Sequence, residues 1–196
     1  MTIIRLAVVE DDPVWMKCLC EYIEKENDLT VIEKATTKEE AFSINIENID
    51  VILLDLTLSD SSDNENLNGL EVANHWNDRG FKNIIMLTSW EEQEIILEAF
   101  DNGAINYVTK TSYRDIPGTI RDAYQGKVSI HSDVSFTLVN ALKTERKMSV
   151  LTPSEREVYK LKEKGLNKNQ IADMLFKSVE TIKKQFKMIN SKIKKR

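Results

Sequence analysis

Short apolar runs alternate with amphipathic stretches over the first 126 residues of the chain. The apolar runs are rich in Val, Ile and Leu and predict five β-strands, at residues 4–9, 29–33, 51–54, 83–88 and 106–109. The stretches between them have helical spacing and predict helices that begin near Pro13, Thr37, Leu70, Glu91 and Tyr113. On the first helix, an apolar face is predicted from Val14, Leu19, Tyr22 and Ile23. Five β–α repeats with short connections predict an α/β fold, a doubly wound five-stranded parallel sheet with helices on both faces.

The alternation stops after residue 126. Residues 127–147 contain a helical stretch, Ser132–Lys143, followed by polar residues, and we interpret them as a linker with a helix of its own. Residues 148–196 have only helical patterns. The sequence therefore predicts two domains, an α/β domain at 1–126 and a small all-α domain at 148–196.

Three short helices are predicted in the second domain. Their capping residues are Thr152, with Pro153 and Glu155 behind it, then Asn167 and then Ser178. On the third helix, an inward apolar stripe is formed by Val179, Ile182, Phe186 and Ile189. Lysines occupy the other side of that helix. Two helices joined by a tight turn, the second of them rich in lysine, predict a helix-turn-helix whose second helix enters the major groove of DNA.

The composition excludes several classes of protein. The apolar runs are only a few residues long, far short of the ~18 that a membrane span needs, and the chain opens without a signal-peptide pattern. Cys18 and Cys20 are the only cysteines and would point to different faces of a helix. With His75 and His131 as the only histidines, a zinc site lacks ligands. We therefore expect a cytoplasmic protein without a disulfide or a zinc site.

Charge is divided unevenly along the chain. Residues 146–196 hold 15 of the 27 Lys and Arg residues and only 5 of the 32 Asp and Glu residues, a net charge of +10. Residues 1–145 hold the other 12 basic and 27 acidic residues, a net charge of −15. Two solvated faces of one mixed surface would give the same count, but such a division is more typical of a basic part that meets a polyanion.

Polar residues follow four of the five predicted strands. They are Glu10, Asp11 and Asp12 after the first, Asp55 after the third, Thr88 and Ser89 at the end of the fourth, and Lys110 after the fifth. Because parallel strands bring their carboxyl ends to one edge of a sheet, we expect these groups to converge. Clustered carboxylates repel one another unless a hard cation lies among them, and oxygen ligands suit Mg²⁺. A lysine and a hydroxyl opposite them can hold a phosphoryl group.

Six short motifs in residues 1–126 resemble the receiver domain of bacterial two-component response regulators. They are V-V-E-D-D-P at 8–13, I-L-L-D-L at 52–56, N-G-L-E at 68–71, M-L-T-S at 86–89, G-A at 103–104 and Y-V-T-K at 107–110. The resemblance implies that Asp55 accepts phosphate from a histidine kinase. It implies that Glu10, Asp11 and Asp55 bind Mg²⁺ together with the backbone carbonyl of Thr57. It further implies that Thr88 is the switch hydroxyl, Tyr107 the switch aromatic residue and Lys110 the phosphate-contacting lysine.

Two departures from the receiver pattern follow Asp55. The family usually has proline four residues after the phosphoacceptor, where this chain has Ser59. A long polar and acidic stretch, residues 59–66, then precedes Asn68. An insertion at this place either alters phosphate lifetime or kinase docking, or is a tolerated surface loop.

Residues 150–193 resemble the LuxR-type helix-turn-helix of the NarL/FixJ regulators. The motifs are L-T-P-S-E-R-E-V at 151–158, G-L-N-K-N-Q-I-A at 165–172 and L-F-K-S-V-E-T-I-K at 175–183. The resemblance implies groove contacts from Lys183, Lys184 and Lys187, with Lys168 and Thr181 near phosphates. The usual histidine is Gln185 here, and a usually apolar position is Lys177.

We therefore predict a DNA-binding response regulator in which phosphorylation of Asp55 controls dimerisation and promoter binding. Its expected partners are a sensor histidine kinase, double-stranded DNA and a second copy of itself, and we expect a stoichiometric phosphoacceptor, not an enzyme. Three alternatives remain: a receiver that is never phosphorylated, an adaptor whose basic domain binds protein, and a small phosphatase. DNA binding predicts a steep loss of affinity with salt, and a phosphatase predicts turnover of free phosphoesters.

Overall fold

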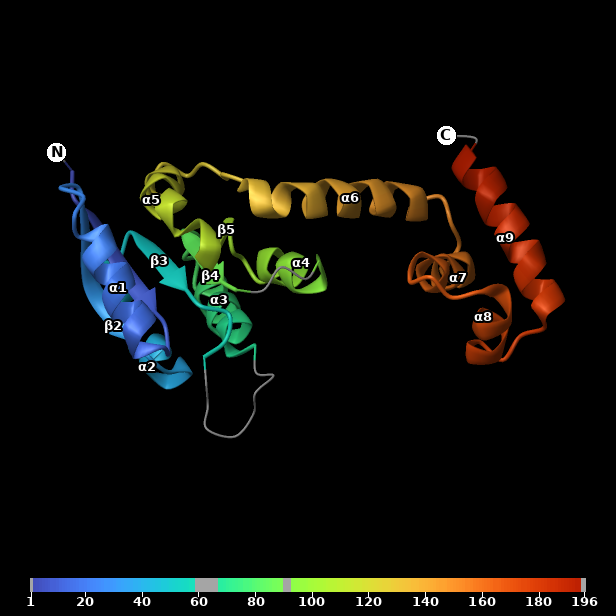
Figure 1. Ribbon diagram of the computed structural model, residues 1–196, viewed down its shortest axis with the longest axis horizontal. Coiled ribbons are helices and arrows are strands. Elements are labelled where there is room, and N and C mark those ends of the chain that lie inside the picture. Colours follow the sequence, from blue (N-terminus) through green and yellow to red (C-terminus); the bar gives the residue numbers. More distant parts are fainter. Residues whose placement is uncertain (1, 59–66, 90–92, 195–196) are drawn as a thin grey trace. The chain divides into compact units, whose positions relative to one another are not determined.

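The computed structural model describes residues 2–58, 67–89 and 93–194 (Figure 1). Contacts divide the chain into two compact units, residues 1–138 and 139–196. The division falls inside one helix, α6 (Ser132–Met148), so the domain limits predicted at residues 126 and 148 stay predictions. Within the described residues, no helix is both long and apolar enough to cross a membrane.

The N-terminal unit is built around a five-stranded parallel sheet. The strands are β1 (Ile4–Val9), β2 (Leu29–Ala35), β3 (Val51–Leu54), β4 (Ile84–Thr88) and β5 (Asn106–Thr109), in the spatial order β2-β1-β3-β4-β5. Every neighbouring pair is parallel. The chain winds in one direction from β1 to β2 and in the opposite direction from β3 onward, so β1 and β3 flank the switch point of the sheet. In doubly wound sheets, ligands bind beside the carboxyl ends of the strands at the switch point. The predicted fold class is confirmed.

Helices cover both faces of the sheet, as Figure 1 shows. One face packs against α1 (Pro13–Ile23) and α5 (Ile116–Tyr124), and the other against α2 (Lys38–Ser43), α3 (Asn68–Asp78) and α4 (Gln93–Asp101). The beginning of α6 adds Val134 to the second face. Because both faces are covered, β3 and β4 are buried at every position and need no polar alternation.

The C-terminal unit contains three helices after α6. They are α7 (Pro153–Glu163), α8 (Lys168–Met174) and α9 (Val179–Lys194), and their shared core includes Val158, Ile171, Ile182 and Ile189. Thr152 with Glu155 and Asn167 with Gln170 form capping boxes at the starts of α7 and α8. The three helices and their caps lie where the sequence predicts them.

Several predicted helices differ from the observed ones. α2 ends at Ser43, and a separate 3₁₀ helix, Ile46–Asn48, precedes β3. Another 3₁₀ helix, Lys110–Asp115, delays the start of α5 to Ile116, because Ser112 leaves the helical region. On α1, Val14 is 70% exposed and the buried face includes Met16 and Cys20 beside Leu19 and Ile23.

α6 extends beyond its predicted end at Lys143 to Met148, because the polar residues that follow are mostly good helix formers. Two regions that the sequence analysis singled out lie outside the described residues: the stretch 59–66, which begins with Ser59, and the expected helix start at Glu91.

Candidate functional site

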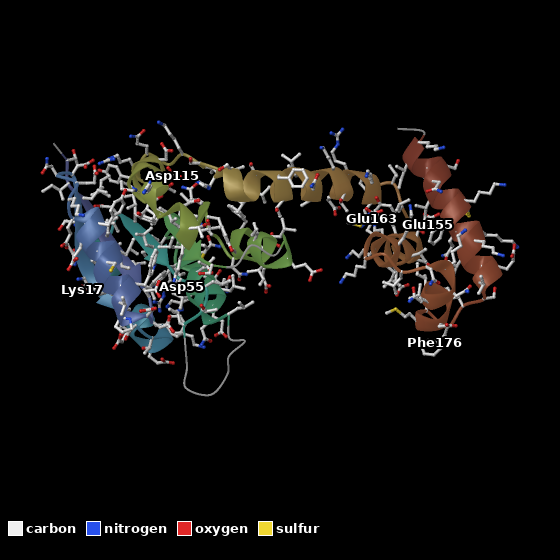
Figure 2. All side chains as sticks on the ribbon, viewed as in Figure 1. Lys17, Asp55, Asp115, Glu155, Glu163 and Phe176 are labelled. Carbon is white, nitrogen blue, oxygen red and sulfur yellow. The ribbon has the colours of Figure 1, made fainter. Side chains whose placement is uncertain are left out.

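Three carboxylates meet at the carboxyl ends of β1 and β3. Glu10 and Asp11 follow β1, Asp55 follows β3, and one oxygen from each lies within 4.8 Å of the others. Glu10 and Asp55 are 1% and 3% exposed, whereas Asp11 is half-buried. Figure 2 labels Asp55 among the side chains of this unit. The structure thus brings together the three acids that the sequence assigns to a metal site.

Asp12 does not belong to this group, because its side chain begins a helix. Its Oδ1 accepts hydrogen bonds from the backbone N–H groups of Val14, at 2.8 Å, and Trp15, at 3.1 Å. These bonds lower the pKa of Asp12 and satisfy two N–H groups at the start of α1. Of the three consecutive acids, Glu10 and Asp11 are therefore the pair left for a metal.

Lys110 lies between the two buried carboxylates. Its Nζ is 2.8 Å from Oδ2 of Asp55 and 2.7 Å from Oε2 of Glu10. The side chain of Lys110 is 18% exposed, so these ion pairs are little screened by solvent. Burial opposes the ammonium charge, but the hydrogen bonds and charges of Asp55 and Glu10 outweigh it and raise the pKa of Lys110.

Glu10 and Asp55 share a single positively charged partner, Lys110. Burial, reinforced by the negative charge of Asp55, raises the pKa of Glu10 to about 7, although Lys110 opposes the shift. Burial also raises the pKa of Asp55. When all are ionised, three carboxylates and one ammonium group leave two negative charges, which one divalent cation neutralises. Carboxylate oxygens are ligands for hard cations such as Mg²⁺, so the residues present fit the expected metal.

The remaining predicted residues surround this cluster at different depths. The backbone N–H of Thr57 lies 3.5 Å from Oδ1 of Asp55. Thr88 is fully buried at the end of β4, in register with Thr109 of β5, one residue before Lys110. Tyr107 is fully buried, with its ring 6.5 Å from that of Phe100. The metal contact of the Thr57 carbonyl and the switch roles of Thr88 and Tyr107 stay predictions.

Comparison with known proteins identifies the N-terminal unit. The response regulator receiver domain matches residues 6–118. The chain belongs to the response regulator receiver family. The resemblance drawn from the sequence motifs is thereby confirmed for this receiver.

Similar proteins extend over nearly the whole chain. It is 27% identical to the transcriptional regulatory protein LiaR of Bacillus subtilis, with 97% of this chain and 90% of LiaR covered. It is 26% identical to the response regulator protein VraR of Staphylococcus epidermidis, with the same coverage, 97% and 90%. A solved complex of the response regulator RcsB with DNA has a TM-score of 0.66 at 21% identity and covers 98% of this chain and 92% of RcsB. At that identity the similarity to RcsB shows the fold.

The receiver also depends on residues that pattern reasoning did not single out. The side-chain amide of Asn68 donates to the carbonyl of Leu58, at 3.0 Å, and the N–H of Gly69 donates to the carbonyl of Leu56, at 2.9 Å. A Cβ at position 69 would overlap the backbone oxygen of Asp55. The Asn68-Gly69 pair directly before the helix start predicted near Leu70 could have indicated this close turn. In the sequence it is recognised only as part of the receiver motif N-G-L-E. Trp15, whose ring lies beside Lys110, gave no signal.

The predicted DNA-contacting residues lie on α8 and α9 and are all exposed. They are Lys168, Thr181, Lys183, Lys184 and Lys187. The hydroxyls of Thr181 and Ser178 are 2.8 Å apart at the start of α9, and Lys183 Nζ is 3.6 Å from Glu180. Figure 2 labels Phe176, which is 97% exposed in the turn between the two helices.

The two departures from the LuxR-type pattern meet at one side chain. Lys177 Nζ and Gln185 Nε2 both donate to the hydroxyl oxygen of Ser154, at 3.0 and 2.9 Å. Ser154 lies in the first turn of α7. Lys177, in the turn between α8 and α9, and Gln185, on α9, therefore both form hydrogen bonds to the start of α7.

Proposed function

We propose that this protein is a DNA-binding response regulator, phosphorylated on Asp55 by a sensor histidine kinase, that binds promoter DNA as a dimer through α7–α9. The observation that carries the proposal is the convergence of Glu10, Asp11, Asp55 and Lys110 at one edge of the sheet. Burying two carboxylates beside one ammonium group costs desolvation free energy that their attraction does not fully return, so the arrangement is better explained by chemistry than by stability. A histidine kinase and DNA as partners would place the protein in the cytoplasm.

Asp55 is the nucleophile in the proposed reaction. One of its carboxylate oxygens forms a bond to phosphorus, while the bond between phosphorus and the phosphohistidine nitrogen of the kinase breaks and the imidazole keeps the electron pair. A Mg²⁺ ion held by Glu10, Asp11, Asp55 and the Thr57 carbonyl would supply charge neutralisation at the transferring oxygens. Lys110, whose Nζ is 2.8 Å from Asp55, would contact those oxygens with its ammonium group. One Asp55 accepts one phosphoryl group, so the protein is a phosphoacceptor, not an enzyme.

Phosphorylation would act as a two-state switch. The hydroxyl of Thr88 donates to the new phosphoryl oxygens, and the ring of Tyr107 adjusts with it. Phosphate controls the protein only as far as it stabilises one state over the other. The stabilised state is the one that dimerises and binds two half-sites of DNA.

The DNA-binding part of the proposal is supported by charge and by similar proteins. The +10 charge of residues 146–196 and the exposed lysines of α9 suit the phosphate backbone of DNA. The name of LiaR is that of a transcriptional regulatory protein, and RcsB has been solved with DNA and as dimers on DNA.

The first experiment incubates the full chain with acetyl phosphate and reads its intact mass. A gain of one phosphoryl group is expected with Mg²⁺, no gain in EDTA, and no gain in Asp55→Asn, which keeps the shape of the side chain but loses its charge. No gain in the wild-type chain, under conditions that modify a known receiver, would reject phosphorylation and favour a receiver controlled by other means.

A further inference from the structure

Trp15 lies against the lysine of the phosphorylation site. The Nζ of Lys110 is 5.5 Å from the centroid of the Trp15 ring, within the ~6 Å at which a cation over an aromatic face is attracted by it. Trp15 stands in the first turn of α1, where its backbone N–H donates to Asp12 at 3.1 Å. The cap that begins α1 thus fixes the point from which the indole reaches Lys110.

Packing holds the indole in this place. Trp15 is half-buried, and within the described residues its Nε1 is buried without a hydrogen-bond partner. With Leu19, Tyr22 and Tyr113, the side chain also lines a cavity of about 350 Å³ beside α1. An indole N–H that is buried without a partner costs free energy, so the surrounding side chains, and not a hydrogen bond among the described residues, fix the position of the ring.

The other two close contacts of Lys110 change during the reaction proposed above. Glu10, 2.7 Å from Nζ, is a ligand of the proposed cation, and Asp55, 2.8 Å from Nζ, becomes the aspartyl phosphate. Each carboxylate therefore acquires a new partner, the cation or the phosphorus atom, besides the ammonium group. The indole face binds neither the cation nor the phosphoryl group, so its attraction for the ammonium group is independent of both.

We propose that Trp15 is a positioning residue for phosphoryl transfer: its indole face holds the ammonium group of Lys110 beside Asp55 while the carboxylate partners of that lysine are engaged. The proposal rests on the proposed function of Asp55. It assigns to α1 a residue that acts on the reaction through Lys110 without touching the phosphoryl group.

The kinetic test compares the full-length wild type with Trp15→Leu and Trp15→Phe, using acetyl phosphate, Mg²⁺ and intact mass over time. Trp15→Leu is expected to lower the maximal rate of phosphorylation about tenfold and to leave the half-saturating acetyl phosphate concentration within about twofold, since it removes the aromatic face. Trp15→Phe keeps an aromatic face and should restore most of the rate.

Tyr22→Leu is the matched control, because Tyr22 is a half-buried aromatic residue of the same helix that lines the same cavity. It should phosphorylate at the wild-type rate, and thermal melts should show all variants folded. Equal rates for Trp15→Leu and wild type would overturn the proposal. An equal loss in Tyr22→Leu would also overturn it, because the effect would then belong to the cavity as a whole.

A second test needs no phosphorylation. Lys110→Met removes the cation from the indole face, so it should change the tryptophan emission of the wild-type chain and leave that of Trp15→Phe unchanged. A change that persists in Trp15→Phe, or no change in the wild-type chain, would contradict the contact. If the mass experiment shows no phosphoryl gain, the proposed function fails, and the emission test still decides whether Trp15 holds Lys110.

Discussion

At the receiver site, burial affects the pKa values of single residues as much as neighbouring charges do. Glu10 and Asp55 share one lysine in a nearly solvent-free place, whereas Asp11 keeps contact with water. Strand-end reasoning predicted that Glu10, Asp11, Asp12, Asp55 and Lys110 converge, because the carboxyl ends of parallel strands must meet. The choice of Glu10 and Asp11 over Asp12 came from the resemblance to receiver domains. Strand-end reasoning did not predict Trp15, because that contact depends on the rotation of α1 about its own axis. The predicted face included Val14, which is exposed, instead of Met16 and Cys20.

The raised pKa of Glu10 predicts how the stability of the metal-free receiver depends on pH. The carboxyl has a pKa near 4.5 when unfolded and about 7 when folded. The folded state therefore binds more protons than the unfolded state between these two pH values. As the pH rises from about 4.5 to about 7, the free energy of unfolding falls by about 1.4 kcal/mol per pH unit, and the contribution of Glu10 is lost above about pH 7. Glu10→Gln should flatten this decline.

Urea unfolding in EDTA at several pH values between about 5 and 8 measures the effect of Glu10→Gln. Trp15 and Trp76 lie in the described part of the N-terminal unit, and the sequence has no tryptophan beyond residue 90, so tryptophan emission follows the unfolding of this unit. The control is Glu21→Gln, at an exposed position of α1, which should keep the wild-type slope. A wild-type slope in Glu10→Gln would mean that another group, such as Asp55, carries the dependence.

The start of α3 is the element that holds the phosphoacceptor strand in place. Asn68 and Gly69 bond to the chain just beyond β3, and the backbone of α3 approaches Asp55 too closely for a side chain at position 69. Gly69→Ala is expected to destabilise the N-terminal unit by about 1–3 kcal/mol through overpacking. It should also slow phosphorylation, since Asp55 must shift with the backbone beside it.

Urea unfolding and the acetyl phosphate reaction measure both consequences of Gly69→Ala. The matched control is Gly118→Ala, in α5, where a Cβ meets no atom within 4 Å. Alanine has the higher helix propensity, so this control should stabilise by roughly 0.5–1 kcal/mol. Similar behaviour of the two variants would show that the close approach at Gly69 has no energetic consequence.

In the C-terminal unit, Ser154 connects three elements through one hydroxyl. Ser154→Ala leaves the amide of Gln185 and the ammonium group of Lys177 without this acceptor. We expect a loss of about 1 kcal/mol, the usual net value of a hydrogen bond. Faster amide hydrogen exchange in peptides from α7 and α9 would report it. Ser191→Ala, at an exposed position of α9, should leave exchange unchanged, and equal exchange in both variants would argue against the connection.

Over the whole chain, the parts that sequence reasoning placed correctly are those with a buried face. The five strands and α7–α9 pack on apolar cores, and burial imposes a period on the sequence. The second half of α6 has no such requirement: residues 139–148 contain none of the fully buried side chains, and the predicted helix ends at Lys143, five residues before the observed end. A solvent-exposed helix needs no regular apolar spacing in its sequence. The sequence therefore contains no pattern that marks where one unit ends and the next begins inside such a helix.

If the protein binds DNA as a dimer only when phosphorylated, one lysine substitution should change the salt dependence of DNA affinity more in the phosphorylated than in the unphosphorylated protein. Each lysine–phosphate contact contributes about 0.9 to the slope of log affinity against log salt concentration, so one substitution counts once in a monomer and twice, about 1.8, in a dimer. Lys168→Gln removes an exposed lysine at the start of α8. In the full chain treated with acetyl phosphate, it should lower the slope on duplex DNA by about 1.8, and in the Asp55→Asn background by about 0.9.

Lys17→Gln is the control for this measurement, because Lys17 is an exposed lysine of the N-terminal unit with a side-chain exposure of 75%. Its slope should equal that of the wild type in both states. A change of about 0.9 in both backgrounds would mean that phosphorylation does not bring a second protomer to the DNA. No change in either would remove Lys168 from the phosphate-contacting residues. Counting one lysine twice thus tests dimerisation on DNA without knowledge of the operator, because phosphate contacts are independent of sequence.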